Sequence, residues 1–455
     1  MNFGEPSGFP FRREGLVWPG DGNKNWTGGM RKGCRGAIAL LVGTLLAPAE
    51  AAELRGHGGP VRAIAVTGDG ASAITGGFDN NAIIWSLGTS AARQVLRFHD
   101  AQVNAVAALA DGRFASAGQD GRVALWREGS AEPDAVLEGH EGPVAALAAS
   151  PDGAWLASAS WDRTLRLWPL AGGEARVLEG HADNVNAVVF LADGTLVSGG
   201  YDATVRFWPA GADGPPEIVT LPSPVNGLAA VGDKLAAGSA DGRVRLLDRA
   251  GKFLGEAEIS ATPVIALAAS PDGTHIAAAG IKGGIALLDA KTLTLKHSLV
   301  GPGLPVWSLA FTADGKTLLT GGSDRLVRRW DVATGEHIGA LITSPADPLA
   351  AYEGDRGAAV FRACVACHTL DASEPPRAGP TLDGIFGRRI ASVPDYPYSE
   401  AFREMDIVWT EETVAKLFEV GPHAYTPGTK MPEQVIGSAA DRDALIAFLA
   451  KTTEE

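Results

Sequence analysis

Short apolar runs and polar turns alternate along the chain at a nearly constant interval from Leu54 to about Ile342. Each unit opens on an apolar run such as PVAALAAS, continues through an Asp-Gly or Gly-Asp turn, and ends on a strand such as TLRLW. The residues that close these strands recur every 39 to 42 positions. They are Trp85, Trp126, Trp168, Trp208, Leu247, Leu288 and Trp330. Because Asp-Gly pairs tolerate positive φ, the pattern predicts seven units of short antiparallel strands joined by hairpins.

Units of this size cannot each bury a hydrophobic core alone. A radial arrangement lets neighbouring units cover one another's faces and leaves few exposed sheet edges. We therefore predict that residues 52–342 form an all-β, seven-bladed propeller. The segment GEHIGALI, residues 335–342, is interpreted as the outer strand of the seventh unit, which leaves the short N-terminal segment spare. The sequence does not decide how the ring closes.

The pattern changes to helical spacing after a Pro- and Ala-rich linker at residues 343–353. Apolar residues recur at helical intervals in DRGAAVFRACVAC and in SAADRDALIAFLAKT near the C-terminus. Shorter helices are expected around Ser399–Met405 and Glu411–Val420. Residues 354–455 are thus predicted to form a second domain, which is all-α.

The N-terminal segment has the layout of a secretory signal. Residues 30–51 contain a basic start, an apolar run and a closing Ala-Glu-Ala triplet that suits a cleavage site. A short membrane anchor is the alternative, but the apolar run is shorter than the ~20 residues of a span. Residues 1–29 are interpreted as a mis-assigned start or a disordered extension. The mature chain would then begin near Ala52 in the periplasm, with no membrane span.

Composition narrows the chemistry that the mature chain can perform. The formal charge of −14 argues against nucleic acid as a partner, since phosphate binding needs a concentrated basic surface. Export would leave two cysteines, Cys364 and Cys367, in the sequence Cys-Val-Ala-Cys-His that ends at His368.

This five-residue sequence has three interpretations. A zinc site would need two more nitrogen or sulfur ligands, and no other cysteine remains in the mature chain. A redox dithiol is expected in a βαβ setting, whereas this context is helical. Cys-x-x-Cys-His is the attachment motif of haem c, in which the thiols bind the porphyrin and the histidine ligates the iron. The mature chain offers two methionines, Met405 and Met431, for the other side of the iron.

Polar residues recur within the repeat units, and they carry a resemblance to the WD-repeat β-propeller family. A Gly-His or Phe-His pair opens each of the first four units, and an aspartate and a hydroxyl precede the closing tryptophan at fixed distances. The resemblance implies a hydrogen-bonded His–Ser/Thr–Asp–Trp set in each of these units. Four histidines are therefore expected to be structural, namely His57, His99, His140 and His181. The fifth and sixth units depart from the pattern, and the seventh lacks the histidine.

The same resemblance implies that one face of the propeller binds partners. The positions that correspond to this face are Arg62, Phe78, Asn104, Trp161, Tyr201 and Trp307. Aromatic and arginine side chains are frequent anchors of protein interfaces. The alternative is that these side chains pack against neighbouring loops.

The C-terminal domain resembles bacterial class I cytochrome c over nearly its whole length. The motifs that carry the resemblance are GPTLDGIFGRR, YPYSEAF, Trp409, YTPGTKMP and a terminal helix, in this order after Cys-Val-Ala-Cys-His. The resemblance implies one covalently attached haem c with His368 and Met431 as iron ligands. Met405 is then expected to have a packing role. The resemblance also implies that the Pro380 carbonyl accepts a hydrogen bond from His368. The residues implied to bind the haem propionates are Arg388, Tyr398, Trp409 and Thr429.

Two functions are compatible with these observations. A haem with histidine and methionine ligands has both axial positions filled and suits the transfer of single electrons. The leading hypothesis is a periplasmic c-type cytochrome that exchanges electrons with a redox protein donor and acceptor, with the propeller as a partner-docking scaffold. The alternative is an oxidoreductase whose propeller holds a catalytic site and uses the haem as an electron outlet. The sequence assigns no catalytic residue and identifies neither the partners nor the reduction potential.

Overall fold

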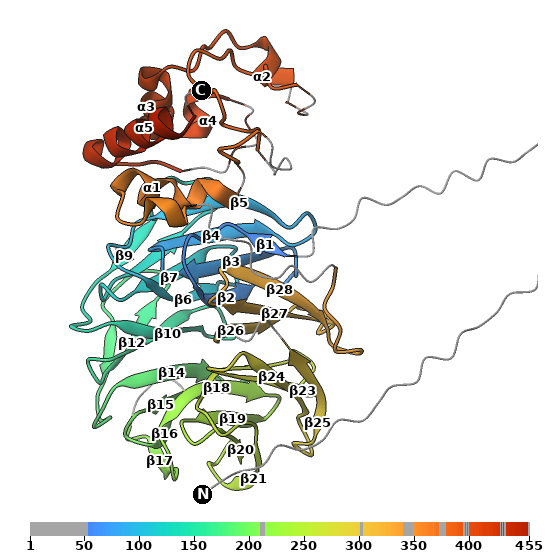
Figure 1. Ribbon diagram of the computed structural model, residues 1–455. Coiled ribbons are helices and arrows are strands. Elements are labelled where there is room, and N and C mark those ends of the chain that lie inside the picture. Colours follow the sequence, from blue (N-terminus) through green and yellow to red (C-terminus); the bar gives the residue numbers. More distant parts are fainter. Residues whose placement is uncertain are drawn as a thin grey trace, which may run out of the picture. The chain divides into compact units, whose positions relative to one another are not determined.

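The structure is a computed structural model that describes residues 53–209, 214–300, 304–339, 349–366, 368–372, 379–394, 396, 398, 400–427, 429, 431 and 434–453. The predicted N-terminal extension, the predicted signal peptide, most of the predicted linker and Cys367 lie outside the described residues. Figure 1 colours the repetitive β region from blue to brown and the helical region from orange to red.

The β region consists of seven four-stranded antiparallel sheets, which confirms the predicted seven-bladed propeller. The first two sheets are β2 (Val61–Val66), β3 (Ser72–Gly77), β4 (Asn81–Ser86), β5 (Ala91–Arg97), and β6 (Val103–Ala108), β7 (Phe114–Gly118), β8 (Val123–Trp126), β9 (Ala135–Leu137). The next two are β10 (Val144–Ala149), β11 (Trp155–Ser160), β12 (Leu165–Pro169), β13 (Arg176–Leu178), and β14 (Val185–Phe190), β15 (Leu196–Gly200), β16 (Thr204–Trp208), β17 (Glu217–Thr220). The fifth and sixth are β18 (Val225–Val231), β19 (Lys234–Ser239), β20 (Arg243–Asp248), β21 (Phe253–Glu258), and β22 (Val264–Ala269), β23 (His275–Gly280), β24 (Gly284–Asp289), β25 (Leu295–Val300). The seventh is β26 (Val306–Phe311), β27 (Thr317–Gly322), β28 (Leu326–Asp331) and β1 (Leu54–Arg55).

The first hairpin of every sheet turns at the glycine that the sequence pattern marks. Seven glycines have φ between 61° and 86°, namely Gly70, Gly112, Gly153, Gly194, Gly232, Gly273 and Gly315. A side chain with a Cβ atom is strained in this region, so the recurring glycine fixes where each hairpin turns. The hairpin interpretation of the sequence is therefore confirmed.

The propeller closes into a ring at its seventh sheet. The innermost strands of successive sheets contact one another, and β2 of the first sheet contacts β26 of the seventh (Figure 1). On the outer edge of β28, β1 pairs with Leu326 and Val327. Further along the same edge, His337 forms a bridge with Trp330, and the Ile338 N–H donates to the Arg329 carbonyl at 2.9 Å.

This closure corrects the interpretation of residues 335–342 as the whole outer strand of the seventh unit. The outer edge of β28 is divided between the N-terminal strand β1 and a short segment around His337. The N-terminal segment is not spare, because it joins the last sheet to the segment that leads into the first sheet. Pairing the two ends of the propeller in this way prevents the ring from opening at the seventh sheet.

A buried ion-pair network, which we call the clasp, lies beside this junction and consists of Glu53, Asp324 and Arg328. The Arg328 Nη1 atom donates to Glu53 Oε1 at 2.7 Å, and Nη2 donates to Asp324 Oδ2 at 2.7 Å. None of the three side chains is more than 4% exposed. The His337 ring also lies close, with its Nε2 atom 3.7 Å from Glu53 Oε1. The clasp therefore ties the residue before β1 to β28.

Replacing Glu53 with alanine is expected to lower the free energy of unfolding of the propeller by about 3 kcal/mol. Removing one partner of a buried ion pair leaves the other charge desolvated and incompletely compensated. Urea unfolding followed by tryptophan fluorescence measures the change. The matched control is Glu258→Gln, which alters a Glu258–Arg243 pair whose glutamate side chain is 61% exposed. The control should change the free energy by less than about 1 kcal/mol, and equal unfolding midpoints for the two variants would contradict the role of the clasp.

The predicted structural histidines are confirmed in the first four sheets. In the first sheet, His57 Nδ1 contacts Asp79 at 3.0 Å, and Nε2 contacts Thr75 Oγ1 at 2.7 Å. The same hydroxyl accepts a hydrogen bond from Trp85 Nε1 at 2.7 Å. The corresponding sets are His99–Asp120–Ser116–Trp126, His140–Asp162–Ser158–Trp168 and His181–Asp202–Ser198–Trp208. Every polar atom that the imidazole and indole bury is thus paired.

Arginine replaces the missing histidine in the fifth and seventh sheets. Arg245 donates from both Nη atoms to Asp241, and Arg328 donates from Nε and Nη2 to Asp324, four residues apart in each case. These arginines lie two residues before Leu247 and Trp330, the positions that close the strand. The aspartate keeps a buried cationic partner although the imidazole is absent.

The C-terminal region is largely helical, as predicted. Its described elements are η1 (Ala350–Tyr352), α1 (Arg356–Phe361), η2 (Arg362–Ala366), α2 (Glu400–Glu404), α3 (Glu411–Val420), α4 (Pro422–Tyr425) and α5 (Ala439–Thr453). A single antiparallel bridge joins Arg389 to Val408 within this described region. Across the described parts of the chain, no helix has both the length and the apolar character that crossing a membrane requires.

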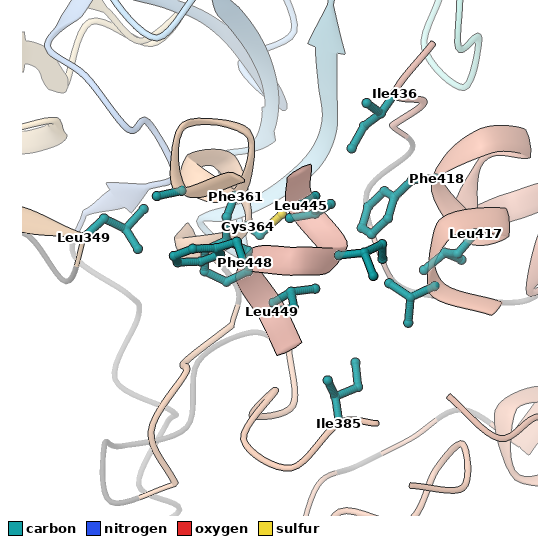
Figure 2. Packing of buried hydrophobic residues seen from close by; sticks show 13 residues of the cluster. Leu349, Phe361, Cys364, Ile385, Leu417, Phe418, Ile436, Leu445, Phe448 and Leu449 are labelled. Carbon is teal, nitrogen blue, oxygen red and sulfur yellow. The ribbon is translucent and has the colours of Figure 1, made fainter. Parts of the chain in front are cut away.

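Helices α1 and α5 pack closely and build the core of this region. A Cβ atom on Gly357 would lie 2.1 Å from the Ala444 carbonyl oxygen, so only glycine permits the approach. Phe361 and Phe448 meet next to it with ring centroids 5.5 Å apart. Figure 2 shows both rings in the apolar cluster, together with Cys364 and Leu445. The crossing of the first and last helices thus brings Cys364 into the core.

Candidate cofactor-binding site

The helical region encloses an apolar cavity of about 280 Å³. His368, Met431 and Cys364 all line it, although they come from segments far apart in the sequence. The other lining residues include Leu382, Ile385, Ile390, Val414, Leu417, Phe418, Leu445 and Leu449. Cavities of this kind, with apolar walls and a few placed polar groups, are typical ligand sites.

His368 is held by a hydrogen bond to the following loop. Its Nδ1 atom lies 2.7 Å from the Pro380 carbonyl oxygen, and its backbone N–H donates to the Cys364 carbonyl at 2.9 Å. A carbonyl can only accept, so Nδ1 carries the hydrogen, and in the neutral ring Nε2 then has a lone pair. A bond of this type fixes the tautomer of a ligating histidine and raises its basicity. The contact that the sequence resemblance implied between His368 and Pro380 is present.

Cys364 lies in η2 and is 5% exposed. Burial raises the pKa of its thiol, so the sulfur stays protonated at neutral pH. The side chain packs among Phe361, Leu445 and Leu449 in the apolar core of this region. Its place in the cavity wall fits attachment of an apolar group.

Met431 lines the cavity, whereas Met405 does not. The Met431 N–H donates to Thr429 Oγ1 at 3.0 Å, and the Thr429 N–H donates to the Thr426 carbonyl at 3.1 Å. Thr426 is buried and donates from its hydroxyl to the Pro422 carbonyl in α4. This chain of bonds fixes the backbone of the methionine segment. The structure therefore gives Thr429, predicted to bind propionates, a second role in positioning Met431.

Arg388 braces the loop that carries Pro380. Its Nη1 and Nη2 atoms donate to the Asp383 and Thr381 carbonyls, each at 2.7 Å. Burial lowers the pKa of Arg388, and among the described residues no carboxylate lies within 4 Å of its guanidinium. A desolvated positive charge in the cavity wall favours an anionic group of a ligand.

A short ladder places Trp409 beside Arg388. The Trp409 N–H donates to the Arg388 carbonyl at 2.9 Å, and the Gly387 N–H donates to the Trp409 carbonyl at 2.7 Å. Both side chains line the cavity as a result. The ladder explains how two residues separated by some twenty positions reach one site.

Three aromatic residues of the YPYSEAF motif form one wall of the cavity. Tyr398 stacks on Phe402 with centroids 6.2 Å apart, and Tyr396 meets Tyr398 edge-on at 4.6 Å. Burial raises the pKa of Tyr398, so its hydroxyl is a proton donor over the physiological range. Sequence reasoning selected Tyr398 but missed Tyr396 and Phe402. Their position in the same motif was the available signal.

The candidate partner face of the propeller divides into two groups. Arg62, Phe78 and Trp307 lie together, with the Arg62 guanidinium 5.8 Å from the Trp307 ring and the Phe78 ring 6.0 Å from it. Trp161 and Tyr201 are exposed. Asn104 is buried, and its Nδ2 atom donates to the Val144 carbonyl of the next sheet at 3.1 Å. The structure thus gives Asn104, predicted to bind a partner, a role in joining two sheets.

Comparison with known families identifies both regions. The family described as "WD domain, G-beta repeat" matches residues 49–86, 91–127, 131–169, 172–209 and 293–331. The family described as "Cytochrome c" matches residues 354–453. Most of the fifth and sixth sheets lies outside the repeat matches, in the units where leucine replaces the closing tryptophan and the histidine is missing.

Individual relatives align with the C-terminal region. It is 40% identical over 105 residues to "Cytochrome c" of Arabidopsis thaliana, which covers 22% of this chain and 93% of the relative. It is 41% identical over 108 residues to "Cytochrome c type-1" of Ascaris suum, and this alignment covers 23% of this chain and 91% of the relative. It is 34% identical over 113 residues to "Cytochrome c2" of Rhodomicrobium vannielii, and this alignment covers 25% of this chain and 90% of the relative. The relatives come from a plant, a nematode and a bacterium, so the likeness is not restricted to bacterial proteins.

Proposed function

The chain belongs to the cytochrome c family through residues 354–453, and from this premise we propose that it is an exported electron-transfer protein whose propeller docks a redox partner. A cytochrome c domain implies a covalently bound haem c and electron transfer through it. The observation that carries the finer proposal is that His368 and Met431 line one cavity with Cys364. The carrier role, the two ligands and the export are parts of this proposal.

The residues of the cavity fit a haem. The donor set combines an imidazole nitrogen with a thioether sulfur, and a cysteine of the attachment motif lies in the same wall. The apolar lining suits a porphyrin ring, and the guanidinium of Arg388 suits a propionate. When bound, the group would supply one-electron redox chemistry.

The chain's own residues prepare the site. The Pro380 carbonyl holds the proton of His368 on Nδ1, so the lone pair of the neutral ring is on Nε2, the atom that would bind a metal. Arg388 holds the loop of Pro380 through two carbonyls, and Thr429 holds the backbone of Met431. The apolar wall excludes water and thereby limits the solvent reorganisation that accompanies a change of charge. These features suit a site that changes its oxidation state without changing its structure.

Two further observations support export and docking. The layout of residues 30–51 is typical of a secretory signal, and haem c is attached outside the cytoplasm in bacteria. A propeller joined to a cytochrome domain by a linker raises the effective concentration of the domain near a docked partner. Weak and short-lived contacts of the cytochrome domain with that partner then become frequent.

Deleting residues 53–342 is expected to slow electron delivery to the native partner by about 100-fold at low protein concentration, since multivalent tethering contributes ~10²–10⁴. Stopped-flow mixing of the reduced protein with the partner measures the rate. The remaining domain should fold alone, because it covers 93% of a free-standing relative. A small-molecule oxidant is the control and should react equally with both forms. Unchanged partner rates after the deletion would remove the docking role and leave the carrier role intact.

A further inference from the structure

The propeller carries a partly buried cation at the end where its innermost strands begin. Arg62 is the second residue of β2, and it is the one charged residue at the equivalent position of the seven innermost strands. Its neighbours at that position are Asn104, Ala145, Asn186, Asn226, Ile265 and Trp307. We call the six residues Arg62, Phe78, Trp161, Tyr201, Ile281 and Trp307 at this end the mouth.

The members of the mouth share one end of the propeller because the strands are antiparallel. The second hairpin of each sheet returns to the end where the innermost strand begins, and the Phe78 N–H donates to the Pro60 carbonyl there at 3.0 Å. Trp161 bonds Pro143 in the same way, and Tyr201 bonds Asn184, each at 2.9 Å. The residue before each turn aspartate therefore lies beside the beginning of its innermost strand.

Most N–H donors of the Arg62 guanidinium make no hydrogen bond to the described residues. Nη1 donates to the Trp307 carbonyl at 3.3 Å, and this is the one hydrogen bond that its side chain makes to the described residues. No carboxylate of the described residues lies within 4 Å of it, in contrast to Arg245 and Arg328 in the blades. Burial lowers the pKa of Arg62, and the influence that opposes this shift is that of Tyr201. A partly desolvated cation that has no carboxylate partner among the described residues is a favourable site for an anion.

Four apolar residues of the mouth form an exposed rim at this end of the propeller. Phe78, Trp161, Tyr201 and Ile281 are 37%, 43%, 44% and 40% exposed, and they lie in the first, third, fourth and sixth sheets. The residues that precede the six turn aspartates and Lys282 are neither acidic nor basic. Exposed apolar residues at the same end as a partly buried charge suit a protein interface with a charged anchor.

We propose that the mouth docks an extended segment of the redox partner that places a carboxylate on Arg62 between apolar side chains. A guanidinium pairs with a carboxylate through two parallel hydrogen bonds, and the unused donors of Arg62 permit this geometry. The apolar rim spans sheets on different sides of the ring, so an extended protein segment covers it better than a small anion. This inference rests on the proposed docking role and names the chemistry of the partner.

The test uses the full-length holoprotein and two synthetic probes, the peptides acetyl-Gly-Phe-Asp-Phe-Gly-amide and its asparagine counterpart. Quenching of tryptophan fluorescence measures binding, since Trp161 and Trp307 belong to the mouth. Charged hydrogen bonds contribute about 1.5–3 kcal/mol. The native protein should therefore bind the aspartate peptide about 10- to 100-fold more tightly than the asparagine peptide.

Two substitutions test whether Arg62 is responsible for the preference for the aspartate peptide. Arg62→Gln should reduce the preference for the aspartate peptide to less than about 2-fold, because the neutral amide cannot pair with a carboxylate. Arg249→Gln is the matched control, since Arg249 lies in the β20–β21 hairpin at the opposite end of the propeller and is largely exposed. The control should keep the full preference. Thermal unfolding monitors the fold of both variants.

Three outcomes would overturn the inference. They are equal binding of the two peptides to the native protein, an undiminished preference in Arg62→Gln, and binding of benzoate as tightly as the aspartate peptide. The last outcome would make the mouth a site for small carboxylates. None of them bears on the deletion of residues 53–342, so the proposed docking role can stand or fall separately.

Discussion

Replacing Cys364 and Cys367 together with serine is expected to abolish covalent haem and to leave the C-terminal domain unfolded. The cavity of about 280 Å³ lies inside the only core that this region has among its described residues. At about 24 cal/mol per Å³, leaving such a space empty costs about 7 kcal/mol. A domain of ~100 residues has a total stability of roughly 5–15 kcal/mol, so the loss is large enough to prevent folding.

Two measurements check this expectation. The intact mass reports the covalent group, and far-UV circular dichroism reports the contribution of α1, α3 and α5. The propeller has separate cores in its sheets, so its thermal transition should persist in the variant. The Thr369→Ser variant, next to the attachment motif, is the matched control and should keep its haem. A double serine variant with native helix content would show that the helices pack without the group.

The blades were predictable because each one is specified locally. The turn glycine, the closing tryptophan and the His–Ser/Thr–Asp set recur within about forty residues, so the pattern can be followed along the chain. The contact of Pro380 with His368 also followed from the sequence, since Pro380 belongs to a motif of the resemblance. Local repetition and a specific motif are the two signals that sequence reasoning uses well.

The remaining features depend on contacts between distant parts of the chain. The β1 strand is two residues long, and its partner in β28 is some 270 residues away, so no periodicity marks it. In the sequence nothing distinguishes Glu53 and Arg328 from ordinary surface charges, because their contact forms only in the closed ring. Asn104 occupies a position of the partner face, and its amide also joins two sheets. Register and side-chain direction decide these cases, and a single sequence does not reveal them.

Replacing Met431 with leucine is expected to remove the proposed sulfur ligand of the iron while preserving the fold. Leucine has nearly the volume of methionine, and the hydrogen bond from the backbone N–H of residue 431 to Thr429 is retained. A thioether favours Fe(II), so its loss should lower the reduction potential, within the range of about 0.8 V over which axial ligands act. The near-infrared band that arises from charge transfer between the sulfur and ferric iron should disappear, and carbon monoxide should bind at the open position.

Met405→Leu is the matched control for this substitution, because Met405 does not line the cavity although both methionines belong to the helical region. It should leave the potential and the near-infrared band unchanged. Potentiometric titration and absorption spectra of the two variants therefore separate ligation from packing. If Met431→Leu kept the band and Met405→Leu lost it, the ligand would be Met405. If both variants kept the native spectrum, the iron would take its second ligand elsewhere, and the assignment of a carrier with histidine and methionine ligands would fail.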